Sequence, residues 1–192
     1  MVESYDCTVL AIDNVVFQCE SQDSCQFVFD DINKPWTQGP YEHDLVHGRN
    51  LHGNVQDWPG LVSNILQSLD FGGFIELEDW SFNFKPIEGV LDKAWREVSD
   101  EMERFQACTA MPSSIERGVY KAYLEVAGFR NINENWVTAK VGNCRKIILD
   151  LIECRLLYMW KIDGVASDEA RIRIETLRKE LASSAQTVYV EW

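Results

Sequence analysis

The stretch HDLVHGRNLHGNVQDWPGLVSNILQSLDFGGFIELEDW, residues 43–80, decides the fold class of this chain. It begins with a short apolar run at 43–47 and ends with another at 74–77. Between them, apolar residues recur three and four positions apart, which predicts one buried face of a helix. A strand, a helix and a strand of this length form a right-handed parallel crossover, so the fold class is α/β.

The ends of this helix are marked by residues that favour helix boundaries. Asn54 or Asp57 can cap its start, Pro59 suits its first turn, and the pair Gly72-Gly73 is expected to end it. The loop at 47–54 then follows the first strand and lies at the carboxyl edge of the sheet, where ligands of open α/β sheets bind.

Several short motifs in and before this stretch follow one another in a fixed order. They are Asp30-Asp31…Lys34-Pro35-Trp36, DLVHGRNLHG at 44–53, Asp57-Trp58-Pro59, and GGFIELED at 72–79. This order resembles the middle of a class I methyltransferase that uses S-adenosylmethionine (SAM). More narrowly, it is similar to the fungal LaeA-like group tied to secondary metabolism and its regulators. The resemblance covers roughly residues 8–80, and the C-terminal half only in pattern.

The resemblance implies a truncated Rossmann-like class I methyltransferase fold. Such a fold has a mostly parallel sheet with an antiparallel C-terminal strand and helices on both faces. We expect a single domain over 1–192. Its core sheet would come from 7–80 and 128–192, and helices at about 81–127 would cover the substrate pocket.

One family feature is absent from the sequence. Class I methyltransferases begin their sheet with a strand and a glycine-rich G-x-G-x-G loop, whose backbone must pass close to the cofactor. This sequence contains no G-x-G, and few residues precede the first expected strand at Thr8–Ile12. We therefore expect the central first strand to be missing. Thr8–Ile12 could slide into its place, or a homodimer or hetero-partner could fill it; a truncated gene product is the other explanation.

Three acids match positions that hold SAM in the resembled family, provided that SAM binding is retained. Asp13, at the end of a strand, corresponds to the acid that holds the ribose hydroxyls. Asp30 or Asp31, with Asp31 preferred, would face the adenine amino group. Each of these acids can instead serve as a turn or strand-end residue.

The candidate catalytic residues are His47, Arg49 and His52, which follow the central strand. A histidine there can act as a general base near neutral pH, and the arginine can hold an anionic or carbonyl oxygen. A scaffold role for His47 is the alternative. Four aromatic residues could line an apolar substrate pocket, although each could equally be a core residue: Trp80, Trp95, Phe105 and Tyr120.

Composition narrows the class of protein. The net charge of −13 argues against nucleic acid or an anionic membrane surface as a partner. No apolar run reaches membrane-spanning length and the start does not resemble a signal peptide, so we expect a cytoplasmic protein. The six cysteines form no C-x-x-C pair. We therefore expect reduced thiols, no disulfide framework and no metal site.

Periodicity predicts the elements of the C-terminal half. Helices are expected at about 89–108, 115–128, 147–162 and 167–182, with strands at 129–141 and 187–192. The helix at 147–162 is apolar on nearly every side, which predicts burial on both sides and makes a partner subunit a natural second cover.

Three functions from different classes follow. The first is a methyltransferase-like enzyme that no longer methylates and needs no cofactor, acting as a cyclase, pericyclase or isomerase on an apolar fungal metabolite. The second is a SAM-dependent methyltransferase completed by a partner chain. The third is a non-catalytic partner subunit of a methyltransferase-like complex.

Overall fold

A computed structural model of the chain describes residues 7–14, 24–36, 39–109, 115–184 and 186–191. These residues form a mixture of strands and helices. The elements are β1 (Val9–Asp13), β2 (Cys25–Phe29), β3 (His43–Arg49), α1 (Trp58–Ser68), β4 (Leu69–Glu78), β5 (Ser81–Pro86), α2 (Lys93–Thr109), α3 (Val119–Ala127), β6 (Thr138–Lys140), α4 (Val141–Ile162), α5 (Ser167–Ser183) and β7 (Val188–Glu191).

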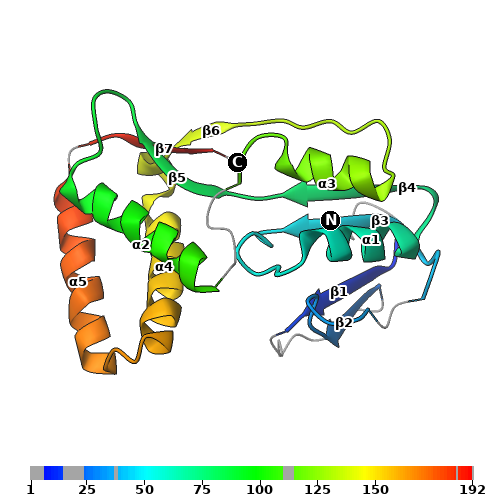
Figure 1. Cartoon of the computed structure of the whole chain (residues 1–192), viewed down its shortest axis with the longest axis horizontal. Helices are drawn as coiled ribbons and strands as arrows, with labels where there is room; N and C mark the ends of the chain where they lie inside the picture. Colours follow the sequence, from blue (N-terminus) through cyan, green and yellow to red (C-terminus); the bar gives the residue numbers. More distant parts are fainter. Residues whose placement is uncertain (1–6, 15–23, 37–38, 110–114, 185, 192) are drawn as a thin grey trace.

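The strands form three small sheets. β1 pairs with β2 in parallel, β3 pairs with β4 in parallel, and β7 lies antiparallel between β5 and β6. Only Asp79 and Trp80 separate β4 from β5, so the second and third sheets are joined along one long strand (Figure 1). The α/β class, the parallel crossover and the antiparallel C-terminal strand are confirmed.

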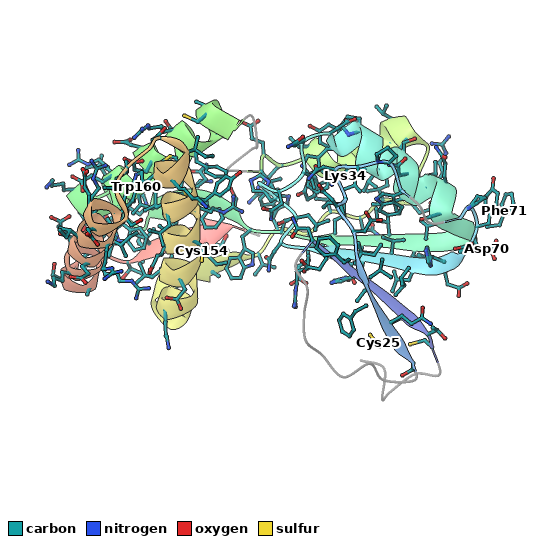
Figure 2. The ribbon with its side chains drawn as sticks, turned by 90° about the horizontal axis from the view of Figure 1, so that it is seen from below. Cys25, Lys34, Asp70, Phe71, Cys154 and Trp160 are labelled. Atoms are coloured by element: carbon teal, nitrogen blue, oxygen red, sulfur yellow. The ribbon has the colours of Figure 1, made fainter. Side chains whose placement is uncertain are left out.

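The β1–β2 pair stands apart from this long sheet. It projects away from the rest of the chain in both views (Figures 1 and 2). In the part of the chain that the structure describes, no strand pairing joins β1 or β2 to β3. The side chains of Phe27 and Phe29 on β2 are exposed, whereas β1 is partly buried except at Asp13.

Helix α1 follows its predicted start but not its predicted end. The Asp57 side chain accepts a hydrogen bond from the backbone N–H of Gly60 at 3.0 Å, and Pro59 lies in the first turn. The helix stops at Ser68, because Leu69 already adopts an extended conformation and starts β4. Gly72 and Gly73 therefore lie within the strand, where the positive φ of 84° at Gly72 suits a glycine.

Several other predicted elements differ in extent, including α3, which begins at Val119, and α4, which begins at Val141. The strand expected at 129–141 is reduced to β6, because the run Asn-Ile-Asn-Glu-Asn at 131–135 stays irregular and Asn131 takes a positive φ. Helix α2 begins at Lys93 instead of near residue 89. Helix α4 is not buried on all sides, since Tyr158 and Ile162 are about half exposed.

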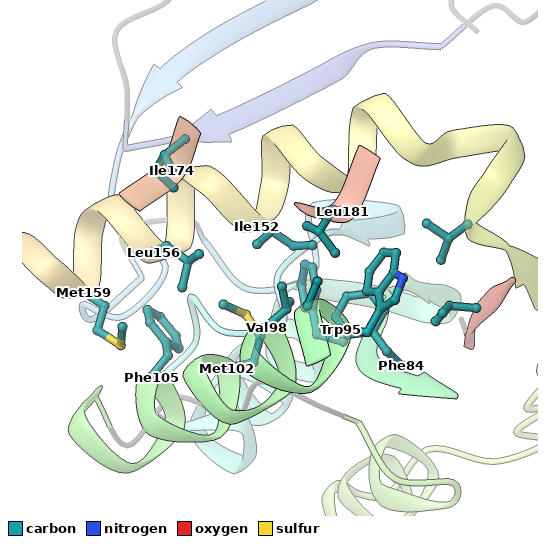
Figure 3. Packing of buried hydrophobic residues seen from close by; sticks show 14 of the residues in the cluster. Phe84, Trp95, Val98, Met102, Phe105, Ile152, Leu156, Met159, Ile174 and Leu181 are labelled. Atoms are coloured by element: carbon teal, nitrogen blue, oxygen red, sulfur yellow. The ribbon is translucent and has the colours of Figure 1, made fainter. Parts of the chain in front are cut away.

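The buried apolar side chains form two clusters. In the first, α2, α4 and α5 pack on β5 and β7, and Figure 3 shows Val98 and Met102 of α2 close to Leu156 of α4. In the second, α1 and α3 pack on β3 and β4. The predicted helices of 81–127 therefore divide between two cores, α2 in one and α3 in the other.

The two clusters lie along different parts of the long strand. Ile75 and Leu77 of β4 contact the α1–α3 cluster, whereas Phe82 and Phe84 of β5 belong to the other. The long strand therefore connects the two cores.

Leu156 offers a direct test of the α2–α4 core. Its side chain is fully buried, whereas the side chain of its neighbour Leu157 is 38% exposed. We expect Leu156→Ala to lower the free energy of unfolding by about 2–5 kcal/mol, because it leaves a cavity. The matched control Leu157→Ala should lower the free energy of unfolding by about 1 kcal/mol or less. Urea denaturation followed by circular dichroism measures both, and equal losses would contradict this packing.

Candidate functional site

A cleft of about 430 Å³ lies at the carboxyl ends of β1, β2, β3 and β4. This is the sheet edge at which the sequence predicted a ligand site. One part of its wall is polar and comes from the loops after the strands: Asn14, Asp31, Asn33, Asn50, His52, Asn54 and Asp79. The other part is mainly aromatic and comes from β5 and the helices α2 and α4: Trp80, Phe82, Phe105, Leu151, Cys154, Arg155 and Tyr158.

Asp79 is the central acid of this site. It directly follows β4 and is only 8% exposed. Its two carboxylate oxygens accept hydrogen bonds from the backbone N–H of His52, at 3.0 and 3.1 Å. The hydroxyl of Tyr120 on α3 donates to Oδ2 at 2.9 Å. Three segments distant in the sequence therefore meet at one carboxylate.

Burial changes the pKa values of Asp79 and Tyr120. Desolvation raises the pKa of Asp79 to about 6, although hydrogen bonds from His52 and Tyr120 and the charge of Arg155 pull it downward. Burial, followed by the nearby Asp79 charge, raises the pKa of Tyr120, so the phenol remains a donor. A carboxyl group with a pKa near neutrality can exchange a proton with a bound ligand.

Arg155 connects helix α4 to this loop. Its Nη2 donates to the backbone carbonyl of His52 at 2.6 Å, and its guanidinium lies 4.7 Å from the ring centre of Phe82. Burial lowers the pKa of Arg155, and the charge of Asp79 opposes this effect. A side chain at Gly53 would collide with the guanidinium, and Gly53 also has a φ of 76°, so glycine is required beside the arginine.

The structure brings five of the predicted site residues together. Asp31, His52, Trp80 and Phe105 line the cleft, and Tyr120 reaches it through Asp79. His52 is 2% exposed, and its backbone N–H is the group that holds the carboxylate.

The other predicted residues lie elsewhere. The exposed His47 ring pairs with Glu76 through Nδ1 at 2.9 Å, because alternation along β3 turns both His47 and Arg49 away from the α1 side. Trp95 is 1% exposed and packs 5.0 Å from the Phe84 ring in the α2–α4 core. Asp13 and Asp30 are not among the residues that line the cleft.

Sequence reasoning did not single out Asp79 or Arg155 as site residues. The signal for Asp79 was its place at the end of a Gly-Gly strand, shared with Glu76 and Glu78. For Arg155 it was its position as the lone cation within the largely apolar run 151–160. Neither signal reveals which carboxylate is buried, because that depends on contacts with α3 and α4.

A search of the described ranges finds no group of three or more His, Cys, Asp or Glu side chains placed to hold a metal ion. None of the helices within those ranges has the length and apolar character needed to span a membrane.

Comparison with curated proteins gives the following relatives. The chain is 32% identical over 85 residues to the methyltransferase cpsF of Aspergillus campestris, covering 41% of this chain and 30% of that protein. It is 28% identical over 119 residues to the secondary metabolism regulator LAE1 of Pyricularia oryzae (59% and 36% of the two chains). It is 24% identical over 180 residues to laeA of Aspergillus niger (83% and 48%).

The chain is similar to LaeA-like, class I methyltransferase-like proteins of fungi. The resemblance drawn from the motifs is thus confirmed. The LaeA-like chain spans less than half the length of these curated relatives. No protein-family profile matches it.

Among solved structures, this LaeA-like chain is similar to two methyltransferases. One is phosphoethanolamine N-methyltransferase 2 of Haemonchus contortus, in complex with S-adenosyl-L-methionine, with a TM-score of 0.42 and 14% identity over 88% of this chain and 36% of that chain. The other is a sarcosine dimethylglycine methyltransferase homologue of Galdieria sulphuraria, with a TM-score of 0.42, 9% identity, and coverage of 88% and 57%.

The raised pKa of Asp79 predicts a pH dependence of stability. The folded state binds the proton more tightly than the unfolded state, whose pKa is near 3.8, so this contribution is complete below about pH 4. It is lost as pH rises through 6. We expect the stability difference between the native chain and Asp79→Asn to fall by about 2 kcal/mol between pH 4 and 7. Urea denaturation across this range measures the difference.

Tyr120→Phe supplies the complementary variant. Removing the hydroxyl takes away a hydrogen bond that favours ionised Asp79, so the pH window should move upward. A native chain and Asp79→Asn with parallel pH profiles would show that Asp79 does not titrate in this window.

Proposed function

We propose that this chain performs a methyltransferase-type reaction of fungal secondary metabolism in the cleft beside Asp79. The relatives named as methyltransferases support the reaction class, and the regulators named LAE1 and laeA support the metabolic setting. The observation that carries the proposal is the buried Asp79 carboxylate between a polar and an aromatic wall. Such a cleft suits a nucleoside-type cofactor beside an apolar acceptor.

The polar wall fits part of SAM. Asp31 offers carboxylate oxygens and Asn14, Asn33 and Asn50 offer amides, which are the acceptors and donors that a ribose and an adenine require. These residues would hold the adenosine portion. SAM, when bound, supplies an electrophilic methyl group.

The remaining residues would act on the acceptor. Asp79 is mostly ionised at pH 7 and can take a proton from an acceptor hydroxyl, while the His52 N–H and the Tyr120 hydroxyl fix the orientation of its carboxylate. Trp80, Phe82 and Phe105 present apolar surface that excludes water.

A second candidate is cyclisation or isomerisation of an apolar metabolite without a cofactor. The observation that favours it is that the polar wall and the aromatic wall of the cleft are attached to different parts of the chain. Asp79 is held by Tyr120 of α3, and Trp80, Phe82 and Phe105 pack in the α2–α4 core, whereas Asp31 and Asn14 follow the strands of the β1–β2 pair. That pair is linked to the main body by contacts such as Asn33 Nδ2 to the Asn54 carbonyl, at 2.8 Å.

We also propose that a strand from another chain completes the sheet, in a homodimer or with a hetero-partner. Among the described residues, β1 pairs only with β2, and β3 only with β4, so each presents an unpaired edge. Size-exclusion chromatography with light scattering tests the homodimer. A monomer at high protein concentration would contradict the homodimer and leave the hetero-partner.

Calorimetric titration with SAM and its demethylated product tests the cofactor proposal. We expect binding by the native chain, and affinity lowered about tenfold or more in Asp31→Asn, because an ionised acceptor becomes a neutral amide. The matched control is Asp44→Asn, since Asp44 is exposed on β3 and lies outside the cleft. Equal affinities of the two variants would remove Asp31 from the cofactor site.

Mass spectrometry of fungal metabolite extracts incubated with the protein separates the two reactions. A SAM-dependent mass gain of one methylene supports methyl transfer. New isomers of unchanged mass that form without SAM support cyclisation or isomerisation. Asp79→Asn should abolish whichever product is found, and a product that persists in this variant would exclude Asp79 as the proton acceptor.

A further inference from the structure

Arg155 is the cation of the cleft beside Asp79. Among the described residues that line this cleft, it is the sole lysine or arginine, whereas Asp31 and Asp79 are acids. Its guanidinium lies 4.7 Å from the ring centre of Phe82 and 5.5 Å from that of Phe105. A cation held against aromatic rings and partly withdrawn from water needs oxygen atoms or an anion to compensate its charge.

The protein itself supplies only part of that compensation. Within the described ranges, the hydrogen-bond partner of Arg155 is a neutral group, the backbone carbonyl of His52, and no carboxylate forms a salt bridge with the guanidinium. A guanidinium carries five N–H donors in a planar fork. Donors of Arg155 therefore remain available to a ligand that enters the cleft.

His52 holds the acid and the cation on its two backbone groups. Its N–H donates to the Asp79 carboxylate at 3.0 and 3.1 Å, and its carbonyl accepts from Arg155 Nη2 at 2.6 Å. The two charges interact across the cleft wall without forming a salt bridge in the described part of the chain. One residue thus places a carboxylate and a guanidinium a short distance apart on the lining of one cleft.

This arrangement suits a hydroxyl group that becomes an anion. As its O–H bond breaks, the proton passes to an oxygen of Asp79 and the electron pair stays on the ligand oxygen. The guanidinium can then donate to that oxygen and stabilise its negative charge. The base and the stabilising cation are both fixed by the His52 loop before the ligand binds.

The acidity of Asp79 limits which hydroxyl it can deprotonate. Burial raises its pKa to about 6. A phenol, with a pKa of about 10, lies about 4 pKa units higher, and a hydroxyl as weakly acidic as water, at about 15.7, lies about 10 units higher. A cation beside the oxygen lowers the pKa of the hydroxyl toward that of the base. Phenols and enols, whose anions are delocalised, therefore fit this pair better than alkyl alcohols.

We propose that the cleft selects an acceptor with an acidic hydroxyl, a phenol or an enol, on a flat apolar body, and that Arg155 binds the oxygen of this hydroxyl as it becomes an anion. The apolar body lies against the rings of Trp80, Phe82 and Phe105. This inference rests on the proposed function, in which Asp79 is the proton acceptor, and it adds the class of acceptor and the residue that recognises it.

The test compares two flat probes in the absence of SAM. One is 7-hydroxycoumarin, a phenol, and the other is 7-methoxycoumarin, in which a methyl group replaces the acidic proton. Calorimetric titration of the native chain should show about tenfold or tighter binding of the phenol. Arg155→Met should abolish this preference, because it removes the charge and the donors. Arg155→Lys, which keeps the charge, should retain part of it.

The ionisation of the bound phenol gives a second readout. The phenolate of 7-hydroxycoumarin absorbs at longer wavelength than the neutral phenol, so absorbance measures the ratio of the two forms. At pH 7, this ratio for the bound probe should be about tenfold or more lower in Arg155→Met than in the native chain, because a neighbouring cation lowers the pKa of a phenol. A purely structural arginine would not move this ratio.

The matched control is Arg173→Met on α5. Arg173 also lies over an aromatic ring, 5.5 Å from the ring centre of Trp160, but it is outside the cleft. This variant should bind both probes as the native chain does. If Arg155→Met binds neither probe, Arg155→Lys decides: a preference for the phenol supports the proposal, and equal affinities contradict it.

The same variants distinguish the acceptor from the cofactor. The affinity for SAM should be equal in the native chain and in Arg155→Met; a loss in the variant would assign the guanidinium to the SAM carboxylate and overturn the proposal. Equal affinities of the native chain for the two coumarins, or an unchanged preference in Arg155→Met, would also overturn it.

Failure here is separate from failure of the proposed function. A chain that binds SAM but does not prefer the phenol contradicts this inference alone. A chain that prefers the phenol but does not bind SAM contradicts methyl transfer and supports the acidic-hydroxyl site.

Discussion

The long strand formed by β4 and β5 is the constraint on which the rest of the structure depends. Its first part, β4, places Ile75 and Leu77 against the core built by α1 and α3, and its second part, β5, places Phe82 and Phe84 in the core built by α2, α4 and α5. Asp79 and Trp80 lie where one core gives way to the other. Because the two parts are continuous, one segment positions both helical groups and the cleft beside Asp79.

The same strand explains why a buried acid lies at the site. Asp79 points to the α3 side, where Tyr120 can donate to it, and the loop after β3 brings the backbone N–H of His52 within reach. These donors offset part of the cost of burying a carboxylate, and the remaining cost appears as a pKa of about 6. Asp79 can therefore accept a proton near neutral pH because its hydrogen bonds offset only part of the free-energy cost of burying its charge.

Local sequence signals predicted where helices and strands lie better than they predicted which other elements cover them. The period of α1, its Asp57 cap and the parallel crossover could be predicted because they depend on neighbouring residues. The exposure of Phe27 and Phe29 on β2, and of Tyr158 on α4, could not, because an apolar run does not reveal whether another element covers it. For the site, position at a strand end placed His52 and Asp31 at the cleft. It misplaced His47 and Arg49, since alternation along β3 decides which face each side chain takes.

The sequence by itself determined the α/β class, the crossover from β3 through α1 to β4, the LaeA-like motifs and the edge of the sheet at which a ligand site lies. Each depends on residue spacing within a few turns or one crossover. Only the tertiary structure decided that β5 extends β4, that Asp79 is the buried acid, and that Arg155 contacts the His52 loop. These features arise where residues from distant segments meet, and desolvation and strand register exist only once those segments are packed together.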